Sequence, residues 1–136
     1  MSQSKYVLMS IKPQFAKLIR DGKKKVELRR VAPKVNAGDT LIIYESAPVS
    51  KVTAIAEIED VVQLTLTELW EIVGHDSMLK KDEFGNYFSG RDVGYGIMLK
   101  NVQEILSPKS LSILPGCVAP QNFRYLSESE FEMLYL

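Results

Sequence analysis

The strongest constraint on the fold of this 136-residue chain is a long segment, Lys51 to Val62, in which two sets of residues alternate. Val52, Ala54, Ala56 and Ile58 fall on one face of it, which is the pattern of a β-strand with a buried side. Two small alanines on that side predict tight curvature or close packing, as inside a small barrel. The segment therefore favours a curved sheet.

Shorter segments on both sides of it also have the composition of strands, rich in β-branched and aromatic residues and bounded by turn residues. A glycine-containing turn, Asn36 to Asp39, separates two of them. We expect these further strands over Lys5–Lys12, Lys24–Val31, Thr40–Ser46, Val93–Ile105 and Asn122–Leu126. The segment between Ser107 and Gln121 is predicted to be a loop or irregular.

Short helices are expected between the strands. Pro13 suits the first position of a helix that Gly22 would end. Thr65 and Glu68 form a capping-box pattern for a second helix, which the sequence GHDS (residues 74–77) is predicted to break. A third short helix is expected around residues 84–88, and a last helical turn from Ser127.

These elements predict an α+β fold: a small β-barrel of mostly antiparallel strands with short flanking helices. The helices are too few and too short for a doubly wound parallel sheet. The length of the chain suits one domain over residues 1–136. In the strand at residues 93–105, Gly94 and Gly96 share a face, which predicts that another backbone or a ligand comes close there.

Cysteine and histidine occur once each, as Cys117 and His75. One thiol cannot form an internal disulfide, and the pair cannot form a conventional zinc site, so we expect no metal. Neither a Walker lysine pattern nor a G-x-G-x-x-G register is present, and we expect no cofactor. The chain has no apolar run long enough for a bilayer and no signal-peptide pattern, so a cytoplasmic location without membrane attachment is expected.

Positive charge is concentrated in one part of a chain whose formal net charge is zero. Eight Lys or Arg residues and two acids lie between Lys12 and Arg30, whereas Glu57 to Glu71 holds five acids and no basic residue. An asymmetry of this kind can orient a protein on an anionic partner, although it also arises by chance. Bulk charge alone does not make the molecule a polyanion binder.

The sequence GKKKVELRR, Gly22 to Arg30, holds most of that positive charge. In a strand, Lys25, Glu27 and Arg29 share one face, and the apolar residues between them face the core. A carboxylate between two cations stays ionised and can hold the guanidinium of Arg29 ready for a phosphate or a base edge. The alternative is an ordinary surface ladder of ion pairs, worth about 0–1 kcal/mol.

Polar and aromatic residues at the strand ends are further candidates. Tyr44 and Ser46 share a face just before a proline loop, where a tyrosine could stack on a base, or could simply be half-buried. The glycine-rich turn that follows residue 88 carries Arg91 and Tyr95, and the last strand carries Arg124. Each of these signals is weak alone.

The sequence SIKPQFAKLIRDGKKKVELRR resembles the signature of the ASCH domain family, within the PUA-like superfamily. That signature runs from Ile-Lys-Pro through a helix to G-x-K-x-x-E-x-R, here Gly22, Lys24, Glu27 and Arg29. The segments IIYESAPVSKVTAIAEIEDV, ELW, YFSGRDVGYGI and PQNFRYL are similar to one branch of the family. The resemblance covers about Val7 to Leu126 and implies a small PUA-like β-barrel, a cleft lined by the motif and a role in RNA biology.

The resemblance first implies a module that binds RNA or a nucleotide in a basic cleft. DNA is a less expected partner, because the chain has no room for the helix-turn-helix that accompanies some relatives. The residues expected to contact the nucleic acid are Lys12, Lys24, Lys25, Arg29, Arg30, Tyr44, Arg91, Tyr95 and Arg124.

Two alternatives remain at this stage. Some relatives are hydrolases acting on RNA or on acylated nucleosides, in which case Lys24, Glu27, Tyr44 and Ser46 would be catalytic. Family amidohydrolases, however, have a threonine where Glu27 stands, and a carboxylate cannot replace a hydroxyl nucleophile in that role. The other alternative is a protein-interaction module that uses the acidic surface around Glu57 to Glu71.

Overall fold

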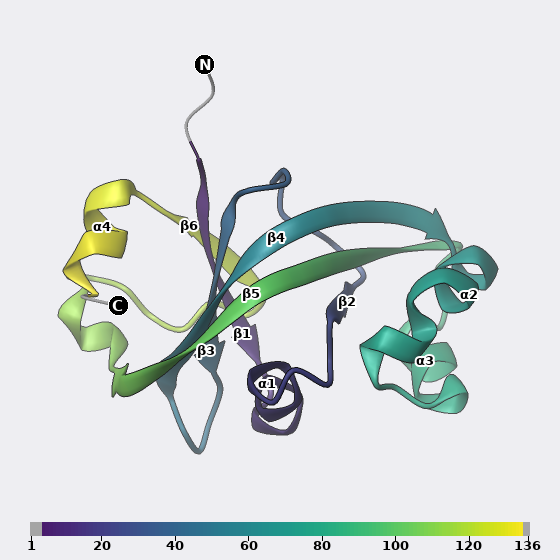
Figure 1. Cartoon of the computed structure of the whole chain (residues 1–136), viewed down its shortest axis with the longest axis horizontal. Coiled ribbons are helices and arrows are strands. Elements are labelled where there is room, and N and C mark those ends of the chain that lie inside the picture. Colours follow the sequence, from purple (N-terminus) through teal and green to yellow (C-terminus); the bar gives the residue numbers. More distant parts are fainter. Residues whose placement is uncertain (1–3, 135–136) are drawn as a thin grey trace.

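The computed structural model of this chain describes residues 4–134 and confirms the α+β class (Figure 1). All the strands of this part of the chain form one six-stranded sheet in the order β2-β5-β4-β3-β1-β6. Every neighbouring pair is antiparallel except β1 and β3, which are parallel. The strands are β1 Tyr6–Ile11, β2 Val26–Arg29, β3 Thr40–Glu45, β4 Lys51–Thr65, β5 Val93–Lys109 and β6 Phe123–Leu126.

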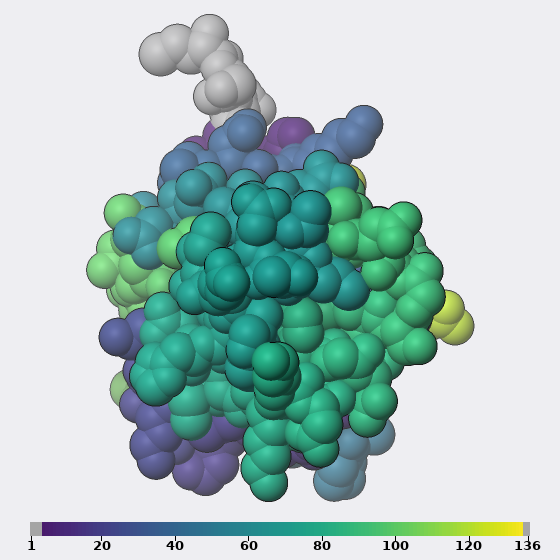
Figure 2. Space-filling view, turned by 90° about the vertical axis from the view of Figure 1, so that its right-hand side faces the viewer, coloured from purple at the N-terminus to yellow at the C-terminus, as the bar shows by residue number. Residues whose placement is uncertain are grey.

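The helices lie around the sheet at three places. In Figure 1, α2 and α3 cover one end of the long strands β4 and β5, α4 lies near the other end, and α1 lies between. Figure 2 looks onto the first end, where the teal atoms of α2 and α3 form a continuous surface. The helices are α1 Pro13–Arg20, α2 Leu66–Ser77, α3 Lys81–Tyr87 and α4 Glu128–Met133, with a 3₁₀ turn, η1, at Leu111–Ile113.

The sheet curls strongly but does not close, so the predicted barrel is an open one. Strands β2 and β6 are its two edges. The edge strand β2 is nevertheless linked to β1, because Arg29 Nη2 donates a hydrogen bond of 2.7 Å to the carbonyl of Ser10. The side chain of Arg29 therefore joins two strands that have no backbone hydrogen bonds to each other.

Three apolar clusters hold the helices on the sheet. Ala16 and Ile19 of α1 pack in the largest one, against β1, β3, β4 and β5. A second cluster joins η1 and the C-terminal segment to β1 and β3. The third joins α2 and α3 to β2 through Val26 and Leu28, which are buried as predicted.

The turn after α1 sets the direction of β2. Asp21 caps the helix, and Gly22 takes a φ of 76°, a conformation that favours glycine. The N–H groups of Lys23 and Lys24 both donate to the carbonyl of Leu18, at 2.9 and 3.0 Å. This arrangement ends α1 and sends the chain back along the sheet.

Helix α2 corrects one prediction, because GHDS does not break it and the helix runs to Ser77. At Gly74 a Cβ would lie only 2.6 Å from the ring of Trp70, so the absence of a side chain at this position lets the ring pack against the helix. Consequently His75 lies on an exposed helical turn rather than in a loop.

The strand after α3 corrects two more predictions. It continues to Lys109, into the segment predicted to be irregular. A Cβ at Gly94 would lie 2.5 Å from the ring of Phe88 and 2.9 Å from Leu69. The close approach expected at this face is therefore made by apolar side chains, rather than by a backbone or a ligand.

None of the helices formed by residues 4–134 has the length and apolar content of a membrane span.

Candidate nucleotide pocket

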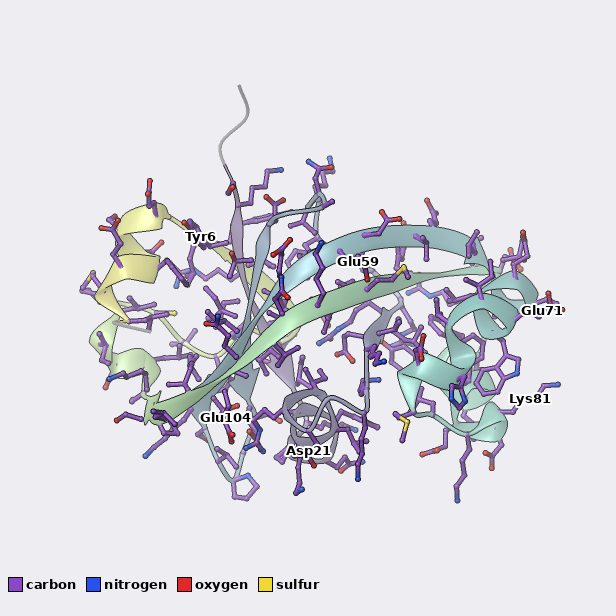
Figure 3. The ribbon with its side chains drawn as sticks, in the orientation of Figure 1. Tyr6, Asp21, Glu59, Glu71, Lys81 and Glu104 are labelled. Carbon is purple, nitrogen blue, oxygen red and sulfur yellow. The ribbon has the colours of Figure 1, made fainter. Side chains whose placement is uncertain are left out.

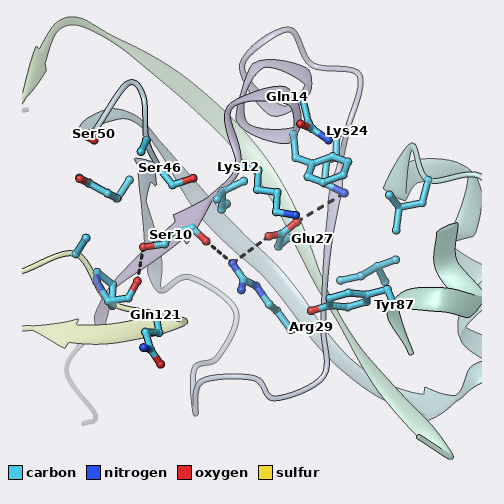
Figure 4. Close-up of a pocket in the computed structure, with 18 of the residues that line it drawn as sticks. Ser10, Lys12, Gln14, Lys24, Glu27, Arg29, Ser46, Ser50, Tyr87 and Gln121 are labelled. Atoms are coloured by element: carbon cyan, nitrogen blue, oxygen red, sulfur yellow. Dashed lines mark hydrogen bonds and ion pairs between the residues drawn. The ribbon is translucent and has the colours of Figure 1, made fainter. Parts of the chain in front are cut away.

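A cavity of about 720 Å³ opens where the end of β1 and the edge strand β2 diverge (Figure 4). Its walls come from the β1–α1 junction, β2, the β3–β4 loop, the α2–α3 connection and the segment before β6. The polar and aromatic side chains that line it are Ser10, Lys12, Gln14, Phe15, Lys24, Glu27, Arg29, Tyr44, Ser46, Ser50, Glu83, Tyr87 and Gln121.

Lys24 is the most buried cation of this cavity, with 2% of its surface exposed. Its Nζ donates a 2.6 Å hydrogen bond to the carbonyl of Ser77 at the end of α2 and lies 5.2 Å from the centre of the Phe15 ring. Burial lowers the pKa of the Lys24 ammonium below its usual 10.5, while the negative charge of Glu27 opposes that shift.

Glu27 lies between two cations. Its carboxylate is 3.6 Å from Lys24 Nζ and 3.2 Å from Arg29 Nη2, and only 7% of the residue is exposed. The direct Glu27–Arg29 pair was predicted from their spacing, but it is buried and is not part of an exposed ladder. We call Lys24, Glu27 and Arg29 the pocket cluster.

Arg29 connects this cluster to β1. The same Nη2 that faces Glu27 also donates to the carbonyl of Ser10, and both interactions are drawn in Figure 4. Its Nε is buried and has no hydrogen-bond partner among residues 4–134. A buried donor without a partner is costly, so the other contacts of Arg29 must compensate for it.

The interior and the rim of the cavity differ in how their charged side chains are paired. Lys24 and Arg29 already face Glu27, whereas Lys12 is exposed and has no carboxylate within 4 Å in the part of the chain that the structure describes. The one carboxylate of Glu27 offsets only one of the two interior cations, so the interior keeps a net positive charge beside the cavity.

Tyr44 and Ser46 enter the cavity from the end of β3, and Glu45 between them points the other way. The carboxylate of Glu45 accepts from Arg20 Nη2 at 3.3 Å and from Thr53 Oγ1 at 2.9 Å. Arg20 also meets Glu104 at 3.2 Å. We call Arg20, Glu45, Thr53 and Glu104 the Arg20 cluster; it lies outside the residues that line the cavity.

The structure brings six of the predicted site residues together in one cavity: Lys12, Lys24, Glu27, Arg29, Tyr44 and Ser46. The other five do not line it. Lys25, Arg30 and Arg91 are exposed, Tyr95 lies on β5 opposite Arg29, and Arg124 forms a 2.8 Å ion pair with Glu130.

The sequence did not indicate several lining residues. Ser10 and Phe15 flank the Lys12–Pro13 start of α1, so the family-like motif could have been extended to them. Tyr87 lies in the segment around residues 84–88 for which the sequence predicts only a short helix, and Glu83 lies one turn before it on α3. Their place in the cavity depends on how α3 packs. Within residues 4–134, no three metal-ligating side chains gather into a metal site.

Comparison with known proteins agrees with this architecture. The family model described as "ASCH domain" matches residues 9–130. An ASCH domain-containing ribonuclease from Zymomonas mobilis is 32% identical over 134 residues, which cover 96% of this chain and 90% of that protein.

Solved structures give the same relationship. The crystal structure of ASCH from Zymomonas mobilis superposes with a TM-score of 0.91 at 30% identity, covering 96% of this chain and 94% of that one. Two variants of it, with a tyrosine changed to phenylalanine or a serine to alanine, superpose equally well. The N-terminal domain of McrB from Staphylothermus marinus shares the fold alone, with a TM-score of 0.59 at 12% identity and coverage of 98% and 94%.

Proposed function

This chain belongs to the ASCH domain family, and from that premise we propose that its pocket binds single-stranded RNA. The observation that carries the proposal is the division of charge in the cavity. In the interior, both cations lie within 4 Å of Glu27, whereas Lys12 on the rim has no carboxylate within 4 Å among residues 4–134. A nucleotide has the matching division, with an uncharged base and sugar on one side and a phosphate on the other.

The residue types of the wall suit such an occupant. Unpaired bases are recognised by stacking on aromatic rings and by hydrogen bonds to their edges. Tyr87 supplies a ring, and Ser46, Gln14 and Arg29 supply hydrogen-bonding groups. Tyr44 also lines the cavity, but it packs in an apolar cluster and only 7% of it is exposed. Base pairs in a duplex hide these faces and edges, so the pocket fits an unpaired nucleotide.

Lys12→Ala tests RNA binding without disturbing a buried group. A short labelled single-stranded RNA is titrated with the protein at several salt concentrations. Loss of one phosphate contact should weaken binding and lower the slope of log affinity against log salt by about 0.7. The matched control is Lys81→Ala. Lys81 is the first residue of α3, and its exposed side chain points away from the molecule (Figure 3). Equal affinities and slopes for both variants and the parent would contradict the proposal.

A second candidate function is cleavage of the bound RNA, and the ribonuclease relative favours it. Attack by a ribose 2′-hydroxyl would join O2′ to phosphorus and break the P–O5′ bond. One group must take the hydroxyl proton and another must return a proton to O5′. Lys24 is suited to the first task, because a lowered pKa increases the fraction of the neutral amine. Tyr44 is suited to the second task, because its hydroxyl can donate a proton.

Lys24→Met separates cleavage from binding. The methionine retains the apolar stem of the side chain and removes the amine. We expect the parent to convert labelled single-stranded RNA into fragments ending in a 2′,3′-cyclic phosphate, and the variant to lose this activity while still binding RNA. Equal fragment yields from the parent and Lys24→Met would exclude this role, whereas the binding proposal would stand.

A further inference from the structure

Arg30 is placed differently from the arginine that precedes it. The side chain of Arg29 turns into the cavity, but the guanidinium carbon of Arg30 lies 5.5 Å from the centre of the Tyr87 ring. Arg30 is exposed, and no carboxylate lies within 4 Å of its guanidinium among residues 4–134. The two arginines at the end of β2 thus take different positions, Arg29 in the cavity and Arg30 over the ring of Tyr87.

Tyr87 takes part in both arrangements. Its ring lines the cavity, as Figure 4 shows, and Arg30 lies over it. The ring of Phe88, which is fully buried, packs against Tyr87 with centres 4.8 Å apart and planes at 72°. Tyr87 is therefore held in place from behind, and it can position a guanidinium at the mouth of the cavity.

A guanidinium held over an aromatic ring is a ready stacking surface. Its plane can take an unpaired base on the side away from the ring, and its N–H groups can contact a phosphate. Arg30 is exposed and lacks an acidic partner, so both capacities are available to a ligand. No other exposed cation lies over a ring of a cavity-lining residue in the described part of the chain.

We propose that Arg30 and Tyr87 form a second nucleotide site, which takes the base adjacent to the nucleotide held in the pocket. This inference rests on the proposed RNA binding and specifies its substrate class. The ligand is a single strand of at least two linked nucleotides, rather than a free nucleoside or mononucleotide. A duplex is excluded from this site, because its bases are already stacked on one another.

The test compares a mononucleotide with a ribodinucleotide by calorimetric titration. The parent should bind the dinucleotide about 5- to 150-fold more tightly, which is the contribution of stacking one base. Arg30→Lys retains the charge but loses the planar surface, and it should abolish most of this ratio while leaving mononucleotide affinity unchanged. Tyr87→Leu should also lower the ratio, whereas Tyr87→Phe and the control Lys81→Ala should preserve it.

The possible failures can be told apart. If neither probe nor a longer single strand binds the parent, the proposed function is wrong and this inference fails with it. If both probes bind the parent equally, or if Arg30→Lys preserves the ratio, the second site is wrong and RNA binding in the pocket stands. A circular dichroism spectrum and a thermal unfolding curve of each variant exclude misfolding as the cause.

Discussion

Two buried arginine–carboxylate clusters in this molecule are built alike and differ in what they border. In the pocket cluster, Glu27 lies between Arg29 and Lys24; in the Arg20 cluster, Glu45 lies between Arg20 and Thr53. Each arginine has a buried Nε without a hydrogen-bond partner among residues 4–134. The first cluster lines the cavity described above, and no residue of the second cluster lines it.

Access to a ligand therefore separates two sites of similar chemistry. The carboxylate of Glu45 joins α1 to β3 and β4 and has no contact with the cavity. The carboxylate of Glu27 holds two cations beside open space, one of them with a lowered pKa. A buried ion pair is weak evidence for function by itself, since the Arg20 cluster has one too. The difference lies in the cavity and in Lys12 on its rim, which has no carboxylate within 4 Å in the described part of the chain.

Glu27→Gln should have the largest effect on stability and on RNA affinity. If it did not, the distinction between the pocket cluster and the Arg20 cluster would be wrong. The substitution retains the shape of the side chain but leaves Lys24 and Arg29 buried without a counter-charge. Removing one partner of a buried pair costs about 3–5 kcal/mol, so the free energy of unfolding should fall by that amount. RNA affinity should fall as well, because Arg29 loses its orientation. Denaturant unfolding and RNA titration measure the two effects.

Glu45→Gln should have a smaller effect, confined to stability. Arg20 retains Glu104, and 22% of its side chain is exposed, so water can compensate part of the loss. The expected decrease in the free energy of unfolding is about 1–3 kcal/mol, with RNA affinity unchanged. A loss of RNA affinity comparable to that of Glu27→Gln would show that the Arg20 cluster positions Tyr44 and Ser46 and belongs to the site.

The sequence predicted the pocket cluster better than its surroundings, for a physical reason. Residues two apart on a strand share a face, so Glu27 and Arg29 could be paired from spacing alone. Lys24 precedes β2, and its burial depends on Phe15 and on the carbonyl of Ser77. Contacts of this kind join distant segments, and local periodicity does not encode them.

The same limit explains the errors in the fold. Gly74 was interpreted as a helix breaker from local propensity, but the Trp70 ring lying over it lets α2 continue. The α+β class followed from the alternation in β4 and from the short helices, whereas the strand order did not follow from the sequence. The open edge between β2 and β6 did not, because a side chain, Arg29, joins β2 to β1 where a backbone ladder would close the barrel.

The dependence of stability on pH should give the smallest and most specific difference between the clusters. Because burial lowers the pKa of Lys24 in the folded protein, the unfolded chain binds more protons than the folded chain between that value and 10.5. The contribution of Lys24 to the free energy of unfolding is thus fully present above 10.5 and is lost as pH falls through the folded pKa. The Arg20 cluster contains no lysine and so has no counterpart to this contribution.

Lys24→Met isolates this contribution. Denaturant unfolding of the parent and the variant is followed from neutral pH to 10.5, and the free energy of the variant is subtracted from that of the parent. The difference should rise with pH, because the parent alone gains stability as Lys24 loses its proton. Lys81→Ala should run parallel to the parent throughout. A difference that falls with pH would mean that Glu27 outweighs burial and holds Lys24 charged, which would also remove the basis for its role as a proton acceptor.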